Sequence, residues 1–523
     1  MNLMMGEMEI EKFRELLQHC ILVSDDSFVS QYRILKEVLE GVCWMSLRED
    51  SCSTSSSLTE QLLFLYKEYD IPPLLQKKIH QFRLTLYQIL NKEEKEQSKI
   101  NSFLHRDIDT INQLLDLLSE GESKKVCIQR VSVSDFPVSA KEIKRMRVIY
   151  HAKDEDFLYV EPLDFVSVEL KKVRYSNKKS PSEFKETCDL LWRGAQLNLL
   201  WVTIDSEGIL FPEYFVIEPD YLIDISTLAE CYRPYGAHPL NYILGKLSPI
   251  ANAMPILLGN IVNLFLDEWV YSEDKPNYIE CMMKAFRLYS LELASCKDLK
   301  DAALEREFAQ KCKMHFEHIG SLIANELVDG TYKLDRRDAV LEPSYVCEAL
   351  GLQGRLDYMQ RDYSALIEMK SGKADEFTLR KSGRFLPFEN HRIQMLLYLA
   401  VLQFLSKEHN VTQAYLLYTK YPLLYPSSPS VGAIKRAINL RNQIVACEYH
   451  IHKQNDTDYT QRLFQNIIPE KLKTLPVGER FWMQYLLPPI ANLNERIQGL
   501  SAIEENYFYR LYNFITKELY LSK

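Results

Sequence analysis

Two short runs in the second half of the chain most narrowly limit its fold, because they predict a β-hairpin with charged residues at fixed places. The runs are Arg355–Met359 and Ala365–Lys370, and a polar turn separates them. Apolar and polar residues alternate in both, as in half-buried strands. Alternate side chains of a strand share a face, so Glu368 and Lys370 are expected to point the same way.

The neighbouring strand is expected to bring Asp357 beside Glu368 and Lys370, so that two carboxylates and one ammonium converge. Crowded carboxylates repel each other, and a hard divalent cation such as Mg²⁺ relieves that repulsion. Such a cation lowers the pKa of its bound water and offsets charge that develops on phosphorus, while a lysine orients the water. A Glu-x-Lys triplet alone is ordinary solvated-strand chemistry. Here, however, both acids lie among apolar residues such as Leu356 and Ile367.

A strongly apolar helix is predicted at residues 391–402, with Gln394 and Tyr398 one turn apart on one face. Both side chains could reach the hairpin or a nucleic-acid backbone. In other contexts, a Gln and a Tyr on an apolar helix are more often buried hydrogen-bonding residues of the core. A strand at residues 412–419 completes a strand-strand-helix-strand order.

Three ordered motifs in this region resemble those of the PD-(D/E)XK nucleases, specifically the RecB-like branch. They are Gly-x-x-Gly-Arg-x-Asp at residues 351–357, Glu-x-Lys-x-Gly-Lys at 368–373 and Gln-x-x-x-Tyr at 394–398. The resemblance implies a Mg²⁺ or Mn²⁺ cofactor and an α/β nuclease core with helical additions. The roles it implies are metal ligation by Asp357, Glu368 and the Met369 carbonyl, catalysis by Lys370, and an auxiliary pair formed by Gln394 and Tyr398.

The same family carries an upstream motif in which a Gly is followed one turn later by a metal-binding His. The corresponding residues here are Gly259 and Asn263, so Asn stands where His is expected. An Asn carbonyl suits Mg²⁺ but offers no imidazole nitrogen to Mn²⁺, and Asp267 or Glu268 could compensate. The alternative is an amphipathic helix in which Asn263 is only a polar surface residue.

Cysteines bear on a second possible cofactor, because some RecB-like nucleases hold an iron-sulfur cluster with one leading and three trailing cysteines. Cys231 resembles the leading position, but after Tyr398 the chain has only Cys447. No cluster is therefore expected, and Cys231 is predicted to be a small buried thiol. The 11 irregularly spaced cysteines, without a signal peptide or a membrane-spanning apolar run, favour a reducing cytoplasm and no membrane.

The net charge of -9 argues against indiscriminate binding of a polyanion, so local basic patches matter more than the sum. One patch lies at residues 171–179. Its alternative interpretation, a solvated charged face, applies to most such runs. The second lies beside the proposed metal site and is expected to contact DNA through Lys373, Arg380, Lys381, Arg384 and Arg392.

The chain is predicted to be a multidomain α+β protein, since 523 residues with 46% hydrophobic content allow several cores. Four parts are expected: a helical N-terminal region at 1–122, a β-rich barrel-like domain at 123–221, a RecB-like nuclease domain at 222–425 and a helical C-terminal region at 426–523. Helices are predicted at 9–22, 58–69, 74–91, 108–118, 430–453 and 479–521, and barrel strands at 126–131, 147–150, 157–160 and 166–170. If the barrel is OB-like, its aromatic residues could stack on single-stranded bases, although core packing is the alternative for most of them.

These features together predict a metal-dependent DNA nuclease that hydrolyses phosphodiester bonds, on single strands or DNA ends, in replication, recombination or repair. The alternative is a catalytically degenerate DNA-binding or scaffold subunit of a helicase-nuclease complex, and an RNA-directed or defence-associated nuclease is also compatible. No phosphate-binding loop of the Gly-x-x-x-x-Gly-Lys-Ser/Thr type occurs. Residues 218–222 resemble a segment of bacterial proteins that continue into a superfamily-1 helicase, so such a helicase is expected as a downstream fusion or a separate subunit.

Overall fold

The computed structural model describes residues 7–22, 28–46, 58, 61–62, 65–66, 69, 71–91, 97–118, 142–163, 170–176, 183–248, 253–272, 274–326, 334–374, 386–405, 413–421, 423–453 and 456–522. The chain divides into two compact units, which we call the first unit and the second unit. The first comprises Met1–Ser176 and Trp192–Glu213, and the second comprises Asn177–Leu191 and Tyr214–Lys523.

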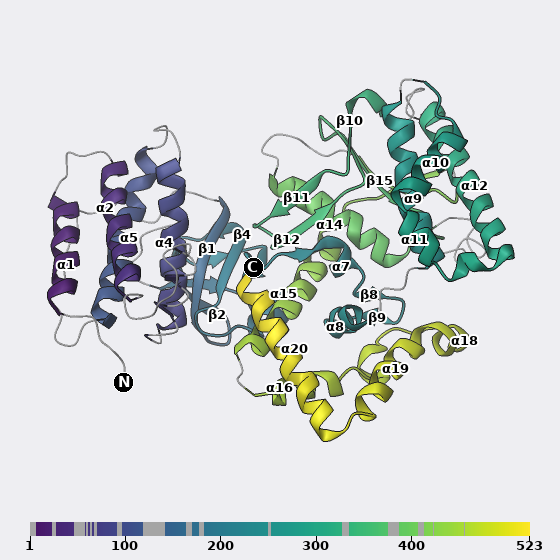
Figure 1. The fold of residues 1–523 in the computed structure, drawn as a ribbon. Coiled ribbons are helices and arrows are strands. Elements are labelled where there is room, and N and C mark those ends of the chain that lie inside the picture. Colours follow the sequence, from purple (N-terminus) through teal and green to yellow (C-terminus); the bar gives the residue numbers. More distant parts are fainter. Residues whose placement is uncertain are drawn as a thin grey trace. The chain divides into compact units, whose positions relative to one another are not determined.

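Helices that pack side by side begin the first unit (Figure 1). They are α1 (Glu7–Leu22), α2 (Phe28–Ser46), α4 (Pro73–Asn91) and α5 (Gln97–Leu118). Their apolar faces meet in one core that includes Leu17, Leu35, Phe82 and Leu114, as expected for amphipathic helices. The predicted helical N-terminal region is thus confirmed. Of the helix predicted at 58–69, the described residues 58, 61–62 and 65–66 are helical.

A small closed β-barrel completes the first unit. Its strands are β1 (Glu142–Lys153), β2 (Phe157–Pro162), β3 (Lys171–Arg174), β4 (Gln196–Ile204) and β5 (Leu210–Phe211). They follow the order β1-β2-β3-β5-β4, and β4 pairs with β1 to close the barrel. The pairing of β3 with β5 is parallel, and the others are antiparallel. The predicted barrel is confirmed, while the strand expected at 126–131 and most of that at 166–170 lie outside the described residues.

A mixed sheet lies at the centre of the second unit. It runs in the order β10 (Ala339–Leu341), β13 (Tyr358–Gln360), β14 (Ala365–Lys370), β15 (Gln413–Tyr418) and β16 (Leu423–Pro426). Helix α14 (Glu389–Leu405) connects β14 to β15, which run parallel. This is the predicted strand-strand-helix-strand order.

The first of those strands is shorter than predicted, because the run Arg355–Met359 is broken in the middle. Arg355 ends β12 (Leu352–Arg355), which belongs to a different sheet formed with β11 (Ser344–Cys347) and β7 (Ile223–Asp224). Tyr358 then begins β13. Asp357 consequently lies at the crossing between two sheets rather than inside one strand, a position at which the backbone changes direction.

Helices cover the mixed sheet and share its core (Figure 1). They are α9 (Met254–Tyr271), α10 (Tyr278–Leu288), α11 (Ser290–Ser295) and α12 (Ala302–Glu326). Ile261 and Phe265 of α9 and Phe316 of α12 belong to the same buried cluster as Ile367 and Tyr415 of the sheet. This packing fixes α9 against the strand that carries Glu368 and Lys370.

The remaining elements of the second unit are mostly helical. They are α6 (Lys185–Asp189), β6 (Tyr214–Ile217), α7 (Ile225–Ala229), β8 (Tyr232–Arg233), β9 (Gly236–Ala237), α8 (Leu240–Leu247), α15 (Val431–Lys453), α16 (Asp458–Gln465), α17 (Pro469–Leu472), α18 (Glu479–Phe481), α19 (Leu487–Gln498) and α20 (Ala502–Ser522). The helical stretch predicted at 479–521 is interrupted by a π-helical turn at Trp482–Leu486 and again at residues 499–501. Pro488 and Pro489 follow the π turn and cannot donate backbone hydrogen bonds to it. Within the described residues, no helix is both long and apolar enough to cross a membrane.

Candidate active site

Asp357 is held against strand β14 by its side chain and its backbone. Its Oδ2 accepts a hydrogen bond from the Met369 backbone N–H at 2.6 Å, and its carbonyl accepts one from the Glu342 N–H at 3.0 Å. The antiparallel register pairs Tyr358 with Ile367. The hairpin therefore brings Asp357 to the segment that carries Glu368, as the sequence predicts.

Glu368 is buried, with an exposed fraction of 3%. Its Oε1 accepts hydrogen bonds from Lys370 Nζ at 2.9 Å and from Gln394 Nε2 at 2.7 Å. Its Oε2 is also buried, and among the described residues it has no hydrogen-bond partner. Native proteins rarely leave a buried carboxylate oxygen without a partner, because its desolvation is then uncompensated.

The electrostatics of the pair favour a bound cation. Burial raises the pKa of the Glu368 carboxyl, and the nearby Asp357 carboxylate raises it further. Burial likewise raises the pKa of Asp357, and the hydrogen bond from Met369 opposes that rise. Two acids that hinder each other's ionisation would both be ionised more readily beside a divalent cation. One or two carboxylates with several water molecules is a usual protein site for Mg²⁺.

Lys370 and Gln394 form one hydrogen-bonded network with Glu368. Lys370 Nζ donates to Gln394 Oε1 at 2.7 Å, and Gln394 Nε2 also donates to Ser226 Oγ at 3.0 Å. The Lys370 side chain is 20% exposed, so part of it reaches solvent while Glu368 and Gln394 hold its ammonium. The structure thus brings together Asp357, Glu368, Lys370 and Gln394.

Tyr398 is fully buried and supports the site from behind. Its hydroxyl donates a hydrogen bond to the Arg355 carbonyl at 2.5 Å. It therefore reaches the hairpin, but it is not placed at an open surface where it could touch a nucleic-acid backbone. A Cβ at position 354 would lie only 3.1 Å from this hydroxyl oxygen, which explains Gly354.

Arg441 explains the other glycine of the motif and is a residue that the sequence did not predict. It is fully buried in α15, and its guanidinium donates to the carbonyls of Glu218 at 2.8 Å, Tyr221 at 2.6 Å and Gly351 at 3.3 Å. Gly351 has a φ of +63°, and a Cβ there would lie 2.3 Å from an Arg441 nitrogen. A lone Arg in an amphipathic helix carries no signal of this role, because its partners are backbone carbonyls far away in sequence.

Helix α9 passes beside the end of β14, since a Cβ at Gly259 would lie 3.4 Å from Ser371 Oγ. Asn263 is half-buried on the next turn. Glu268 is ion-paired with Lys284 and is therefore engaged. Of the two carboxylates that could compensate for Asn263, only Asp267 therefore has no such ion pair among the described residues. The pKa of Asp267 is raised to about 6, chiefly by burial and then by Glu342.

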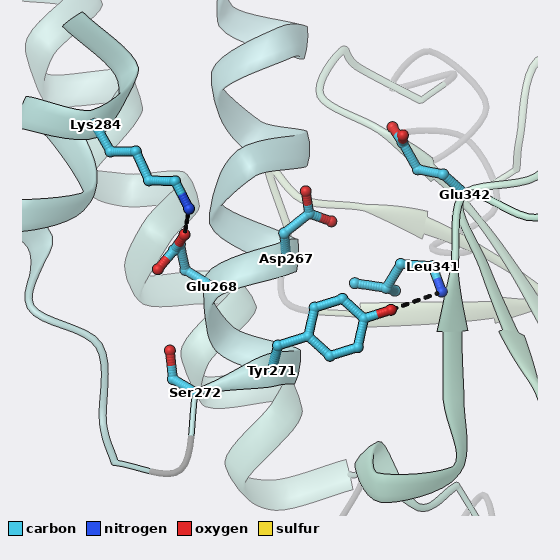
Figure 2. A pocket seen from close by; sticks show the side chains of 7 residues that line it. All are labelled: Asp267, Glu268, Tyr271, Ser272, Lys284, Leu341 and Glu342. Carbon is cyan, nitrogen blue, oxygen red and sulfur yellow. Dashed lines mark hydrogen bonds and ion pairs between the residues drawn. The ribbon is translucent and has the colours of Figure 1, made fainter. Parts of the chain in front are cut away.

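Asp267 lines a pocket of about 450 Å³ next to this region. Figure 2 shows that the carboxylates of Asp267 and Glu342 both point into it, and that the Tyr271 hydroxyl accepts a hydrogen bond from the Leu341 backbone N–H, at 3.4 Å. Glu342 also raises the pKa of Asp357 and forms an ion pair with Arg355 at 2.9 Å. Glu342 is thus a further acidic residue near the site. Glu342 lies between two strands, β10 and β11, so no alternation of apolar and polar residues in the sequence predicts its role.

The predicted DNA-contacting residues have different surroundings. Lys373 is exposed. Arg392 is paired through two hydrogen bonds with Glu389, at 2.8 and 2.7 Å, so its charge is largely offset within α14. Arg380, Lys381 and Arg384 lie outside the described residues.

Cys231 is buried, as predicted, and its thiol donates to the Thr227 carbonyl at 3.4 Å. Burial raises the pKa of this thiol to about 12. Within the described part of the chain, no group of three or more His, Cys, Asp or Glu side chains is placed to hold a metal ion. A metal at the candidate site would therefore rely on two carboxylates, a backbone carbonyl and water.

Comparison of the chain with protein-family models and with curated proteins gave no match.

Proposed function

We propose that this protein is a Mg²⁺- or Mn²⁺-dependent DNA nuclease of RecB-like PD-(D/E)XK type, which hydrolyses phosphodiester bonds on single strands or DNA ends in replication, recombination or repair. One observation carries the proposal. Glu368 is buried with one oxygen unpartnered, lies beside Asp357, and receives a hydrogen bond from Lys370.

The residues present fit a hard divalent cation. Asp357, Glu368 and the Met369 carbonyl would hold it, and the unpartnered Oε2 of Glu368 would gain a partner. When bound, such an ion supplies a water of lowered pKa and offsets charge on the phosphate. Asn263, which the sequence also predicts as a ligand, would add a neutral amide oxygen in place of the imidazole nitrogen that the family carries.

Lys370 is the group that we assign to the reacting phosphate and water. Glu368 and Gln394 hold its ammonium at 2.9 and 2.7 Å, and the side chain remains 20% exposed. An ammonium so placed orients the attacking water and stabilises the negative charge that grows on the phosphate oxygens. The water oxygen loses a proton to solvent and bonds to phosphorus, the phosphorus–oxygen bond to the leaving strand breaks, and the leaving oxygen takes up a proton from solvent.

Asn263 favours a second candidate function, a DNA-binding or scaffold subunit of a helicase-nuclease complex whose site no longer cleaves. The absence of a third side-chain ligand among the described residues also favours it. In that case a superfamily-1 helicase, fused downstream or a separate subunit, would carry the enzymatic activity.

Cleavage of end-labelled single- and double-stranded DNA in Mg²⁺ and in Mn²⁺ tests the proposal. Asp357→Ala and Lys370→Ala are expected to abolish cutting. Asp362→Ala, which removes an exposed carboxylate from the turn of the same hairpin, and Lys313→Ala, on the exposed face of α12, are expected to cut normally.

Calorimetric titration of the protein with Mn²⁺ gives a readout that is independent of cleavage. The wild-type protein is expected to bind the ion, and Glu368→Gln to bind it at least tenfold more weakly. Metal binding without cleavage by the wild type would favour the binding-subunit alternative. If the wild-type protein shows no metal binding and no cleavage, the nuclease proposal is refuted.

A further inference from the structure

Strands β2 and β3 of the barrel expose aromatic and cationic side chains on the same face. Along β2, Leu158 and Val160 are buried while Phe157 and Tyr159 are half-buried on the opposite face. Along β3, Val173 is buried, with Lys172 and Arg174 on the opposite face. The barrel interior is thus filled by aliphatic side chains, and the aromatic rings of β2 lie outside it.

The strand register pairs these outer residues across the two strands. Phe157 is opposite Arg174, and Tyr159 is opposite Lys172. Each pair therefore joins one aromatic ring to one cation, as expected for directly opposed residues on one face of a sheet. We call these four residues the β2–β3 platform.

The rings of the platform are held in place before any ligand arrives. The Arg174 guanidinium lies 4.8 Å from the centre of the Phe157 ring, within cation–π range. The Tyr159 hydroxyl donates to Asp154 Oδ2 at 2.7 Å. The other oxygen of Asp154 accepts from the backbone N–H groups of Asp156 and Phe157, at 2.9 and 2.7 Å. Rings fixed in this way lose little conformational entropy when a flat ligand stacks on them.

The topology identifies this face as a binding face. A closed five-stranded barrel in the order β1-β2-β3-β5-β4 has the arrangement of an OB-fold. Such barrels bind oligonucleotides and oligosaccharides on the face of strands 2 and 3. The two cations of the platform favour a polyanion, and the two rings favour one whose bases are unpaired and free to stack.

We propose that the β2–β3 platform binds single-stranded DNA, with bases stacked on Phe157 and Tyr159 and phosphates at Lys172 and Arg174. This site lies in the first unit, requires no metal and is independent of the proposed nuclease activity.

Binding of a fluorescein-labelled oligo-dT to the full-length protein, followed by fluorescence anisotropy in EDTA, tests the proposal. All proteins carry Asp357→Ala so that no strand is cut. Phe157→Ala is expected to weaken binding by about 5- to 150-fold, the loss of one stacked base. Tyr159→Phe keeps the ring and is expected to bind as tightly as its parent, whereas Tyr159→Ala is not.

The charges are tested by the salt dependence of binding. The double variant Lys172→Ala, Arg174→Ala is expected to lower the slope of log K against log salt by roughly 1.4, about 0.7 for each charge on a single strand. Tyr507→Ala and Lys313→Ala are the matched controls, because both side chains are well exposed in the second unit. Both are expected to leave the affinity and the slope unchanged.

Thermal melting of each variant establishes that it is folded. Phe157→Tyr keeps an aromatic ring at this position and is expected to bind like its parent, unlike Phe157→Ala. If folded Phe157→Ala and the double variant bind like their parent, the platform is refuted. Equal binding of duplex DNA, or displacement of the oligonucleotide by heparin as readily as by oligo-dT, would also refute base stacking. When the same platform substitutions are made in the wild-type background, without Asp357→Ala, retained Mg²⁺-dependent cleavage would separate this site from the proposed active site.

Discussion

Replacement of Gly351 by Ala tests whether the buried Arg441 organises the region around Asp357. Gly351 adopts a φ of +63°, which an L-residue adopts at a cost of about 1–2 kcal/mol. The added Cβ would also lie 2.3 Å from one Arg441 nitrogen and 2.6 Å from its central carbon. The guanidinium is enclosed on all sides, so it can move only by giving up hydrogen bonds to carbonyls such as those of Glu218 and Tyr221.

The size of the effect follows from those contacts. A hydrogen bond to a charged group contributes about 1.5–3 kcal/mol. Loss of two of them, added to the backbone strain, predicts that Gly351→Ala lowers the free energy of unfolding of the second unit by about 5 kcal/mol. Gly208→Ala is the matched control, because Gly208 has a φ of +77° and an added Cβ would have no neighbour within 4 Å. Only the strain, about 1–2 kcal/mol, is expected there.

A double-mutant cycle separates the collision from the strain. In an Arg441→Ala background the collision is gone, so Gly351→Ala is expected to cost only about 1–2 kcal/mol more. Urea unfolding read by hydrogen exchange in peptides of β12 and α15 follows the second unit by itself, and peptides of β4 serve for Gly208. Additive losses in the cycle, with a coupling below about 1 kcal/mol, would show that Arg441 and Gly351 do not constrain each other.

Three other predictions concern Gln394, Tyr398 and His315. Gln394→Leu removes the amide that links Lys370 to Glu368, so we expect a fall in the cleavage rate of about tenfold or more with DNA binding intact, whereas an unchanged rate would show that Lys370 needs no such positioning. Tyr398→Phe leaves the Arg355 carbonyl without its donor, so we expect a loss of about 1–3 kcal/mol in urea unfolding, and a loss of less than 0.5 kcal/mol would contradict this role. His315 is 1% exposed, and burial lowers its pKa to about 4. Because the folded-state pKa lies below the unfolded value of about 6.5, its stabilisation is complete above pH 6.5 and is lost as the pH falls, by about 2 kcal/mol at pH 5 and about 3 kcal/mol below pH 4. His315→Gln is expected to lack this part of the acid sensitivity, and identical pH profiles of the two proteins would contradict it.

The sequence predicted those parts of the site that local rules determine. Strand periodicity placed Glu368 and Lys370 on one face, and a hairpin was enough to bring Asp357 beside them. Helical spacing placed Gln394 where it meets both charged groups. In each case the relevant contact lies within one supersecondary unit, so neighbours in sequence determine neighbours in space.

Other parts depend on contacts that no local rule contains. The strand predicted at Arg355–Met359 breaks at Asp357 because its two ends pair with different sheets. Ser226 reaches Gln394 from 168 positions away in sequence, and Arg441 is 90 positions from Gly351. Glu389 and Arg392, in contrast, have the i, i+3 spacing at which opposite charges pair on a helix, so the sequence itself favours this ion pair over a DNA contact by Arg392.

The barrel closes unevenly, and this has a consequence for how it moves. Strands β1 and β4 are joined along most of their length, from Glu142 opposite Thr203 to Ile149 opposite Gln196. In contrast, β3 and β5 meet at one described pair, Val173 and Leu210. We therefore expect the barrel to open transiently between β3 and β5 while the pairing of β1 with β4 persists. Amide protons of β3 are then expected to exchange with solvent before those of β1. A ligand that contacts both β2 and β3 would hold β3 more firmly against β2. Ligand binding on that face would therefore slow the opening between β3 and β5, although the ligand does not contact β5.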